Sequence, residues 1–167
     1  MDYQLSTQKK PTVFFASDHA GYELKNVLLA FVRDELGYEV EDCGAHELNS
    51  EDDYTDFVSI AAKHVSENPL QSRAIVLGGS GQGEAMCANR FPHVRAGVYY
   101  GNGGVQTDAK GEELTLLKSL RLHNDANVLS LGARFMREEE AKDAVRVFLS
   151  AEYKDEERHT RRIAKLG

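Results

Sequence analysis

Cysteines are scarce in this sequence, and long apolar runs are absent. The 167 residues include only two cysteines, Cys43 and Cys87, which are too few for a disulfide framework and lack the spacing of metal ligands. No apolar run approaches the roughly 20 residues that span a bilayer, and the polar segment 1–10 lacks the apolar core of a signal peptide. These absences argue against a membrane protein or a disulfide-rich secreted protein, and they predict a cytoplasmic protein with reduced thiols.

Net positive charge is lacking as well. The chain carries 20 Lys and Arg against 27 Asp and Glu, a formal net charge of -7, which argues against nucleic acid or an anionic membrane as a partner. The C-terminal region departs from this balance because basic side chains cluster there: Arg158, His159, Arg161, Arg162 and Lys165. This cluster predicts a site for a specific anion, and the alternative is a solvated helix face.

The glycine-rich segment 76–84 carries the clearest chemical signal. Gly78 and Gly83 have the spacing of a phosphate-binding P-loop, but Glu84 stands where that loop needs its lysine. The dinucleotide fingerprint is missing too, because Glu84 lies three residues after Gly81, where a third glycine is required. The segment therefore argues against nucleotide or flavin binding. It predicts a loop that presents backbone N–H groups and one carboxylate to a substrate, as aldose–ketose chemistry would use; the alternative is a tight strand-to-helix turn.

Apolar runs alternate with segments of helical periodicity along the chain. Strands are expected at 12–17, 38–43, 73–77, 94–99 and 127–131, with helices between and after them. This alternation predicts a parallel sheet covered on both faces. Residues 112–122 are expected to form a helix after a surface excursion at 101–111. Residues 1–11 are expected to form a flexible arm before a single domain, 12–167.

The same periodicities predict which side chains are buried. Ile60 falls on the expected buried stripe of the second helix. Met86 and Cys87 are expected in the core rather than among the catalytic residues. Three histidines have no mutual spacing that indicates a metal site, and no metal is expected: His46, His64 and His93.

Polar residues follow several of the predicted strands. In open parallel sheets, ligands bind beyond the C-terminal ends of the strands. The residues expected there are Asp18, His19, Tyr54, Glu84 and Arg134. Singly, these features have structural explanations, since a turn at Asp18 and His19 caps the next helix and His123 would end one. Jointly, the acids, the bases and the basic cluster are expected around one edge of the sheet.

Four motifs can now be taken together: S-D-H-A-G-Y-E-L-K at 17–25, G-G-S-G-Q-G-E at 78–84, H-N-D-A-N-V-L at 123–129, and Arg158-His159 with Arg162. In this order they resemble the sugar-phosphate isomerase family that contains ribose-5-phosphate isomerase B and the galactose-6-phosphate isomerase subunits. The resemblance runs from about Val13 to Ile163. It implies a three-layer α/β/α Rossmann-like domain with a five-stranded parallel sheet and an extra C-terminal helix. It also implies a homodimer with active sites at the subunit interface, with a tetramer as the alternative.

The resemblance further implies a reaction. It is the reversible conversion of ribose 5-phosphate to ribulose 5-phosphate through an enediolate, with a small-molecule sugar phosphate as the ligand and no cofactor. Many members of the family use a cysteine as the base, and the position that matches it is Gly78. This sequence resembles the branch in which a glutamate, here Glu84, moves the proton.

Further roles follow from the resemblance, residue by residue. His123 with Asp18 resembles the pair that opens the sugar ring, and Tyr54 lies beside the sugar. The residues that would surround the enediolate are Ser80, Asn124, Gly79, Gly81 and Gly83. The residues that resemble the phosphate-contacting set are His19, Arg134, Arg158, His159 and Arg162. Arg158 and Arg162 are four residues apart, so they lie on one helix face, as bidentate phosphate recognition requires.

Alternatives to ribose 5-phosphate stay open. The segment between Tyr100 and His123 is longer than the family leads us to expect, and it leads to the ring-opening histidine. Another sugar phosphate, such as galactose 6-phosphate, allose 6-phosphate or a tetrose phosphate, is therefore an alternative substrate. A protein that binds a sugar phosphate without catalysis is the alternative from a different class, although Glu84 and His123 argue against it.

Overall fold

The structure is a computed structural model that describes residues 9–101, 103–104, 106–108 and 110–167. Its centre is a sheet of five parallel strands. In spatial order these are β2 (Val40–Asp42), β1 (Thr12–Ser17), β3 (Ser72–Gly78), β7 (Val128–Gly132) and β4 (Ala96–Tyr99). Ile75 in the middle strand pairs with Phe15 on one side and Leu129 on the other, and all three are fully buried. Such apolar strands suit a parallel sheet that is covered on both faces.

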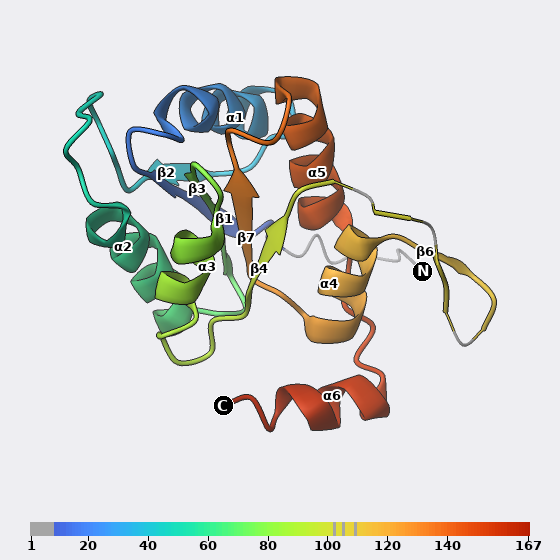
Figure 1. The fold of residues 1–167 in the computed structure, drawn as a ribbon. Helices are drawn as coiled ribbons and strands as arrows, with labels where there is room; N and C mark the ends of the chain where they lie inside the picture. Colours follow the sequence, from blue (N-terminus) through green and yellow to red (C-terminus); the bar gives the residue numbers. More distant parts are fainter. Residues whose placement is uncertain (1–8, 102, 105, 109) are drawn as a thin grey trace, which may run out of the picture.

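Helices cover both faces of the sheet (Figure 1). On one face lie α1 (Tyr22–Asp34), α4 (Leu116–Asn124) and α5 (Glu138–Ser150), and on the other lie α2 (Tyr54–Glu67) and α3 (Gln82–Ala88). The core is divided accordingly. Alternate residues of β1 point to opposite faces, so Phe15 packs in the first layer and Phe14 in the second. The three-layer α/β/α arrangement expected from the sequence is confirmed.

Two elements lie outside the three layers. The hairpin formed by β5 (Gln106–Thr107) and β6 (Glu113–Leu114) is antiparallel and separate from the central sheet. The C-terminal helix α6 (Glu157–Ile163) lies beyond α4, at the bottom of Figure 1. The predicted extra C-terminal helix is therefore present.

The helix expected at 112–122 starts later than predicted. Glu113 and Leu114 pair with the opposite strand of the hairpin, which takes them out of the helix. The helix begins at Leu116, and the Thr115 side chain caps it by accepting a hydrogen bond from the Lys118 N–H. The expected surface excursion thus includes one strand of the β5–β6 hairpin.

Two predictions of burial were wrong. Ile60 is 47% exposed because the buried stripe of α2 consists of Val58, Ala61, Ala62 and Val65, which leaves residue 60 on the outer side. Met86 is 71% exposed on α3, whereas Cys87 is buried as expected. The second strand is also shorter than predicted.

The predicted N-terminal arm lies mostly outside the described residues. Of its described part, the Lys10 ammonium donates a hydrogen bond of 2.8 Å to the Leu36 carbonyl oxygen. No helix in the described part of the chain combines the length and the apolar character needed to cross a bilayer.

Candidate active site

The glycine loop between β3 and α3 is fixed by contacts with the end of β7. The Ser130 hydroxyl donates a hydrogen bond of 2.6 Å to the Gly81 carbonyl oxygen, and the Ala133 N–H donates one of 2.8 Å to the Gly78 carbonyl oxygen. Gly81 has a φ of 75°, and a Cβ there would lie 2.9 Å from the Leu131 carbonyl carbon. Glycine is therefore required at this point, and the loop is a fixed element at the C-terminal edge of the sheet.

Glu84 and Gly78 share one space in this loop. Glu84 belongs to the first turn of α3 and is only 4% exposed. A Cβ at Gly78 would lie 1.7 Å from Oε1 of Glu84, so the carboxyl group fills the volume that any side chain at residue 78 would need. With the Glu84 carboxyl group in this position, the chain has room only for glycine at residue 78.

Burial is the main influence on the acidity of this carboxyl group. It raises the pKa of Glu84, a hydrogen bond from the residue's own backbone N–H opposes the rise, and the nearby Asp18 carboxylate adds to it. Asp18 is itself 8% exposed, and its Oδ1 accepts a 2.9 Å hydrogen bond from the Ala20 N–H. A carboxylate with a raised pKa is a stronger base in its ionised form, so Glu84 is suited to accept a proton.

A cavity of about 450 Å³ opens beside Glu84. Its lining includes most residues predicted for the C-terminal edge: Asp18, His19, Tyr54, Gly79, Ser80, Gly83 and Arg134, together with Phe135. Two of the glycines let larger groups approach closely, since a Cβ at Gly83 would lie 2.6 Å from the Tyr54 hydroxyl and one at Gly79 3.2 Å from Arg134 Nη1. We call this space the first cavity; it brings a base, hydroxyl groups and cationic side chains together.

The cationic end of the first cavity depends on a histidine–aspartate pair. Nδ1 of His19 lies 2.7 Å from Oδ1 of Asp52, and the same oxygen accepts a 3.0 Å hydrogen bond from the His19 N–H. This contact is the main cause of a raised pKa for His19, and the Asp18 carboxylate also raises it, while Arg134 lowers it. A protonated imidazole next to a guanidinium is a suitable receptor for a phosphate group.

The remaining predicted site residues line a second cavity of about 690 Å³: His123, Asn124, Arg158, His159 and Arg162. The imidazole rings of His123 and His159 are stacked, with centroids 4.3 Å apart and planes 10° apart. Nδ1 of His123 lies 3.3 Å from the Ser119 hydroxyl. Burial lowers the pKa of His159, and the neighbouring His123 lowers it further, so the His159 ring favours its neutral form.

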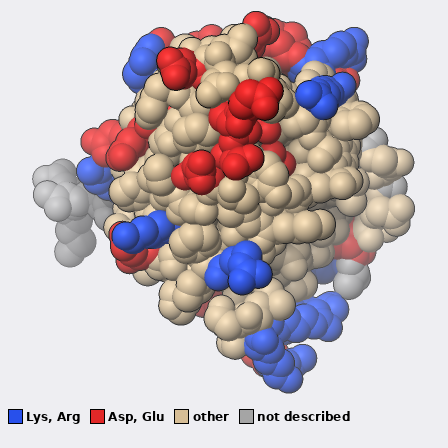
Figure 2. All heavy atoms as spheres, turned by 60° about the vertical axis from the view of Figure 1, so that its left-hand side comes forward, with Lys and Arg blue, Asp and Glu red and all other residues tan. Residues whose placement is uncertain are grey.

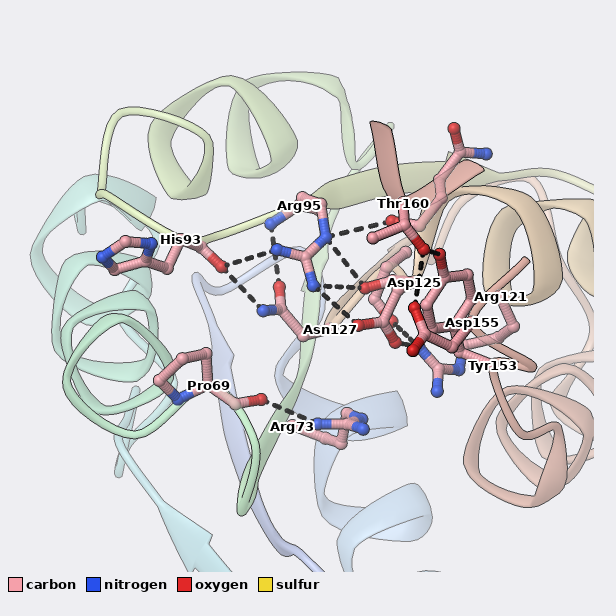
Figure 3. Close-up of polar contacts among 12 residues, drawn as sticks. Pro69, Arg73, His93, Arg95, Arg121, Asp125, Asn127, Tyr153, Asp155 and Thr160 are labelled. Atoms are coloured by element: carbon pink, nitrogen blue, oxygen red, sulfur yellow. Dashed lines mark hydrogen bonds and ion pairs between the residues drawn. The ribbon is translucent and has the colours of Figure 1, made fainter. Parts of the chain in front are cut away.

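A partly buried ion network holds the turn that carries His123 (Figure 3). Asp125 ends α4 with a φ of 42° and receives Arg121 Nη1 on one carboxylate oxygen and Arg95 Nη2 on the other, each at 3.0 Å. Arg95 also donates 3.0 Å hydrogen bonds to the carbonyl oxygens of Asn124 and Asp125. The two arginines thereby fix the backbone between α4 and β7.

The two cavities lie at opposite edges of the sheet. The glycine loop follows β3, whereas His123 and Asn124 precede β7, which runs parallel to β3 (Figure 1). The expectation that all acids, bases and basic residues surround one edge is therefore wrong for a single chain. Figure 2 shows acidic side chains gathered in the upper half of one face and a group of basic side chains at its lower end, with further basic side chains at its upper corners.

Three residues with positioning contacts were missed in the sequence. Asp52 precedes a helix, and an acid there is indicated only as a helix cap. Arg121 had a detectable signal, because it lies four residues after Leu117 on the same helix face and both are buried. Arg95 lies just before β4, and no pattern in the sequence indicates its role.

Among the described residues there are two groups of three side chains whose potential metal-ligand atoms lie within 4.8 Å of one another. One consists of Asp18, His19 and Asp52, the other of Glu41, Cys43 and His64. The first already has an internal hydrogen bond between His19 and Asp52. In the second, burial raises the pKa of the Cys43 thiol to about 12, which disfavours the thiolate that binds metals.

Comparisons with known proteins identify the family to which the chain belongs. The family model described as Ribose/Galactose Isomerase matches residues 13–166. Ribose-5-phosphate isomerase B of Mycobacterium tuberculosis is 36% identical over 155 residues, which cover 93% of this chain and 87% of that protein.

Solved structures are similar over the same extent. Ribose-5-phosphate isomerase B from Mycoplasma genitalium, with bound ribulose-5-phosphate, has a TM-score of 0.81 at 30% identity and covers 95% of each chain. The enzyme from Anaplasma phagocytophilum also has a TM-score of 0.81, at 33% identity, over 97% of this chain and 100% of that one. The chain therefore belongs to the ribose/galactose isomerase family.

Proposed function

We propose that this protein is an aldose–ketose isomerase that interconverts ribose 5-phosphate and ribulose 5-phosphate. The observation that carries the proposal is the buried Glu84 carboxyl group, whose raised pKa and position beside Ser80 suit a general base. Relatives named ribose-5-phosphate isomerase B support the choice of substrate, as does the solved relative that holds ribulose-5-phosphate.

In the proposed reaction, Glu84 removes the proton from C2 of the open-chain aldose phosphate. The electron pair of the broken C–H bond forms a C1–C2 double bond, and the aldehyde oxygen takes up the negative charge. Ser80 and the N–H groups of Gly79 and Gly83 stabilise that charge as hydrogen-bond donors. A proton shift between the two oxygens and return of the proton from Glu84 to C1 complete the conversion to the ketose.

The phosphate group would be bound at the cationic end of the site. His19 and Arg134 provide two cationic groups within the first cavity. Arg158 and Arg162 lie one turn apart on α6 and line the second cavity. Guanidinium groups bind phosphate through paired hydrogen bonds, so all four residues suit this role if the two cavities come together.

We infer a homodimer in which the first cavity of one protomer faces the second cavity of its partner. The division of the site residues between opposite edges supports this inference, because His123 can then act with Asp18 only across an interface. Exposed apolar side chains support it too, since Phe135, which lines the first cavity, is 66% exposed and Met86 on α3 is 71% exposed.

A panel of aldose phosphates tests the proposed activity. Ribose 5-phosphate, galactose 6-phosphate, allose 6-phosphate and a tetrose phosphate are assayed for ketose formation with the purified protein. We expect ribose 5-phosphate to give the highest kcat/KM, and a higher value for another sugar would overturn that choice of substrate. Tight binding without exchange of the C2 proton into solvent would indicate a binding protein without catalysis.

A further inference from the structure

The β5–β6 hairpin has no part in the reaction described above. It lies between β4 and α4 and forms no pairs with the central sheet. Thr107, Asp108 and Lys110 of this hairpin nevertheless line the second cavity, which Arg158 and Arg162 also line. The hairpin is thus a wall of the space that holds the basic face of α6.

One ion pair connects the hairpin to the beginning of α6. Lys110 Nζ lies 2.8 Å from Oε1 of Glu156, which is 46 residues away in sequence. Glu156 is the N-cap residue of α6, and its carbonyl oxygen accepts the N–H groups of His159 and Thr160 at 2.9 and 3.0 Å. Its side chain caps no N–H group of the helix, so it is available to pair with Lys110.

The contacts continue from Glu156 to the predicted ring-opening histidine. Oε2 of Glu156 lies 4.0 Å from Nε2 of His159, whose ring is stacked on His123. The backbone of Lys110 is itself held within the hairpin, because Oδ1 of Asp108 accepts the N–H groups of Lys110 and Glu112 at 2.8 and 2.9 Å. A chain of contacts therefore runs from the hairpin to α6, which carries Arg158, and on to His123.

We propose that Lys110 is a positioning residue of the substrate site, which holds α6 through Glu156 so that Arg158 and Arg162 present their guanidinium groups to the phosphate. This inference rests on the proposed function, because it assigns the second cavity to the phosphate end of the substrate. The hairpin acts as a brace for a short helix. Lys110 acts through Glu156 and not by contact with the substrate.

The charge states of both partners agree with this role. The Lys110 ammonium is the main cause of a lowered pKa for Glu156, and Glu156 is the main cause of a raised pKa for Lys110, so both are ionised near neutral pH. The pair is exposed, with 67% of the Lys110 and 40% of the Glu156 side chain accessible. Exposed pairs contribute little to stability, so its removal should alter substrate binding rather than folding.

The test compares Lys110→Met, Glu156→Gln and the double variant in steady-state kinetics. Each single variant is expected to raise KM about three- to fivefold, the range that loss of an exposed ion pair allows, with kcat within about twofold of the parent. The double variant should be no worse than either single one, and Lys110→Arg should restore KM. Lys63→Met is the matched control, because Lys63 is exposed to the same extent as Lys110 and pairs with Glu67 on α2, away from both cavities.

Glu156→Gln decides between positioning and direct contact. If Lys110 bound the phosphate itself, freeing it from Glu156 would lower KM. If the two residues acted independently, their effects would add in the double variant. Either result would overturn the proposal. Unchanged KM in both single variants would do so as well. Calorimetric titration with inorganic phosphate keeps the test separate from the proposed function. Even if no sugar phosphate is isomerised, both single variants should weaken phosphate binding by a similar factor while the Lys63 control does not.

Discussion

Oδ1 of Asp52 receives both the ring Nδ1 and the backbone N–H of His19, at 2.7 and 3.0 Å. The aspartate comes from the acidic segment before α2, and the histidine follows β1, so the pair joins two loops at the C-terminal edge of the sheet. This double contact orients the imidazole and favours its protonated form. His19 is thereby prepared to bind an anion beside Arg134.

Asp52→Asn is expected to change how substrate affinity depends on pH. A raised pKa means that the cationic form of His19 is fully present at low pH and is lost as pH rises through that pKa. In the variant, this loss should begin at a lower pH, because an amide does not stabilise the imidazolium. KM measured across neutral pH for parent and variant checks this, since ionisation of the substrate phosphate is common to both. Identical pH profiles would contradict the role of Asp52.

Glu84→Gln is expected to remove most of the turnover and leave binding intact. A positioned general base typically contributes about 10² to 10⁴-fold, so kcat should fall by that factor. The amide keeps the shape of the buried side chain, and the affinity for ribulose 5-phosphate measured by calorimetry should change little. In the parent enzyme, the rate should fall as pH drops through the raised pKa of Glu84, because only the carboxylate accepts a proton. A variant with parental kcat would show that another group is the base.

Gly78→Ala tests whether the carboxyl group needs the empty space at the end of β3. The new Cβ would displace Glu84 Oε1, now 1.7 Å from that point, and misplacement of a catalytic group by about 1 Å can cost about 10²-fold in rate. Overpacking should also lower the free energy of unfolding by about 1–3 kcal/mol. In a Glu84→Ala background the same substitution should cost almost nothing. A double-mutant cycle of unfolding free energies measures the coupling, and additive effects would argue against the shared space.

Much of this architecture follows from local patterns in the sequence. The apolar run before Gly78 predicts β3, and the glycines that follow it predict the loop, because both depend on neighbouring residues only. The β5–β6 hairpin is different. Its strands have two residues each and pair with each other, so they are too short for any periodicity in the sequence to predict them.

The division of the site was in principle accessible from strand direction. In a parallel sheet, residues that follow a strand and residues that precede one lie at opposite edges. Glu84 follows β3 and His123 precedes β7, which the family motifs alone do not distinguish. The contact of Asp125 with Arg95 joins residues that are 30 positions apart in the sequence, and only the folded chain shows it.

Arg121→Met is expected to lower the free energy of unfolding by about 3 kcal/mol. Arg121 is only 4% exposed and Asp125 is 25% exposed, and removal of one partner from this partly buried ion pair leaves the other insufficiently compensated. The remaining contact with Arg95 should keep the loss near the lower end of the usual range. Chemical denaturation measures the change. Arg146→Met, which removes an exposed pair with Asp143 on α5, is the control and should cost less than about 1 kcal/mol.

Glu84→Gln and His123→Gln subunits together test the shared active site. Each homodimer should be nearly inactive, because every site lacks either the base or the ring-opening histidine. If Glu84 of one protomer acts with His123 of the other, a mixed dimer has one site with both substitutions and one site with neither. Random reassociation of equal amounts should therefore restore about a quarter of the parental activity. A mixture of either variant with itself, treated in the same way, is the control. Absence of recovery, although mass spectrometry shows mixed dimers, would place both residues of each site in one chain and contradict the proposed arrangement.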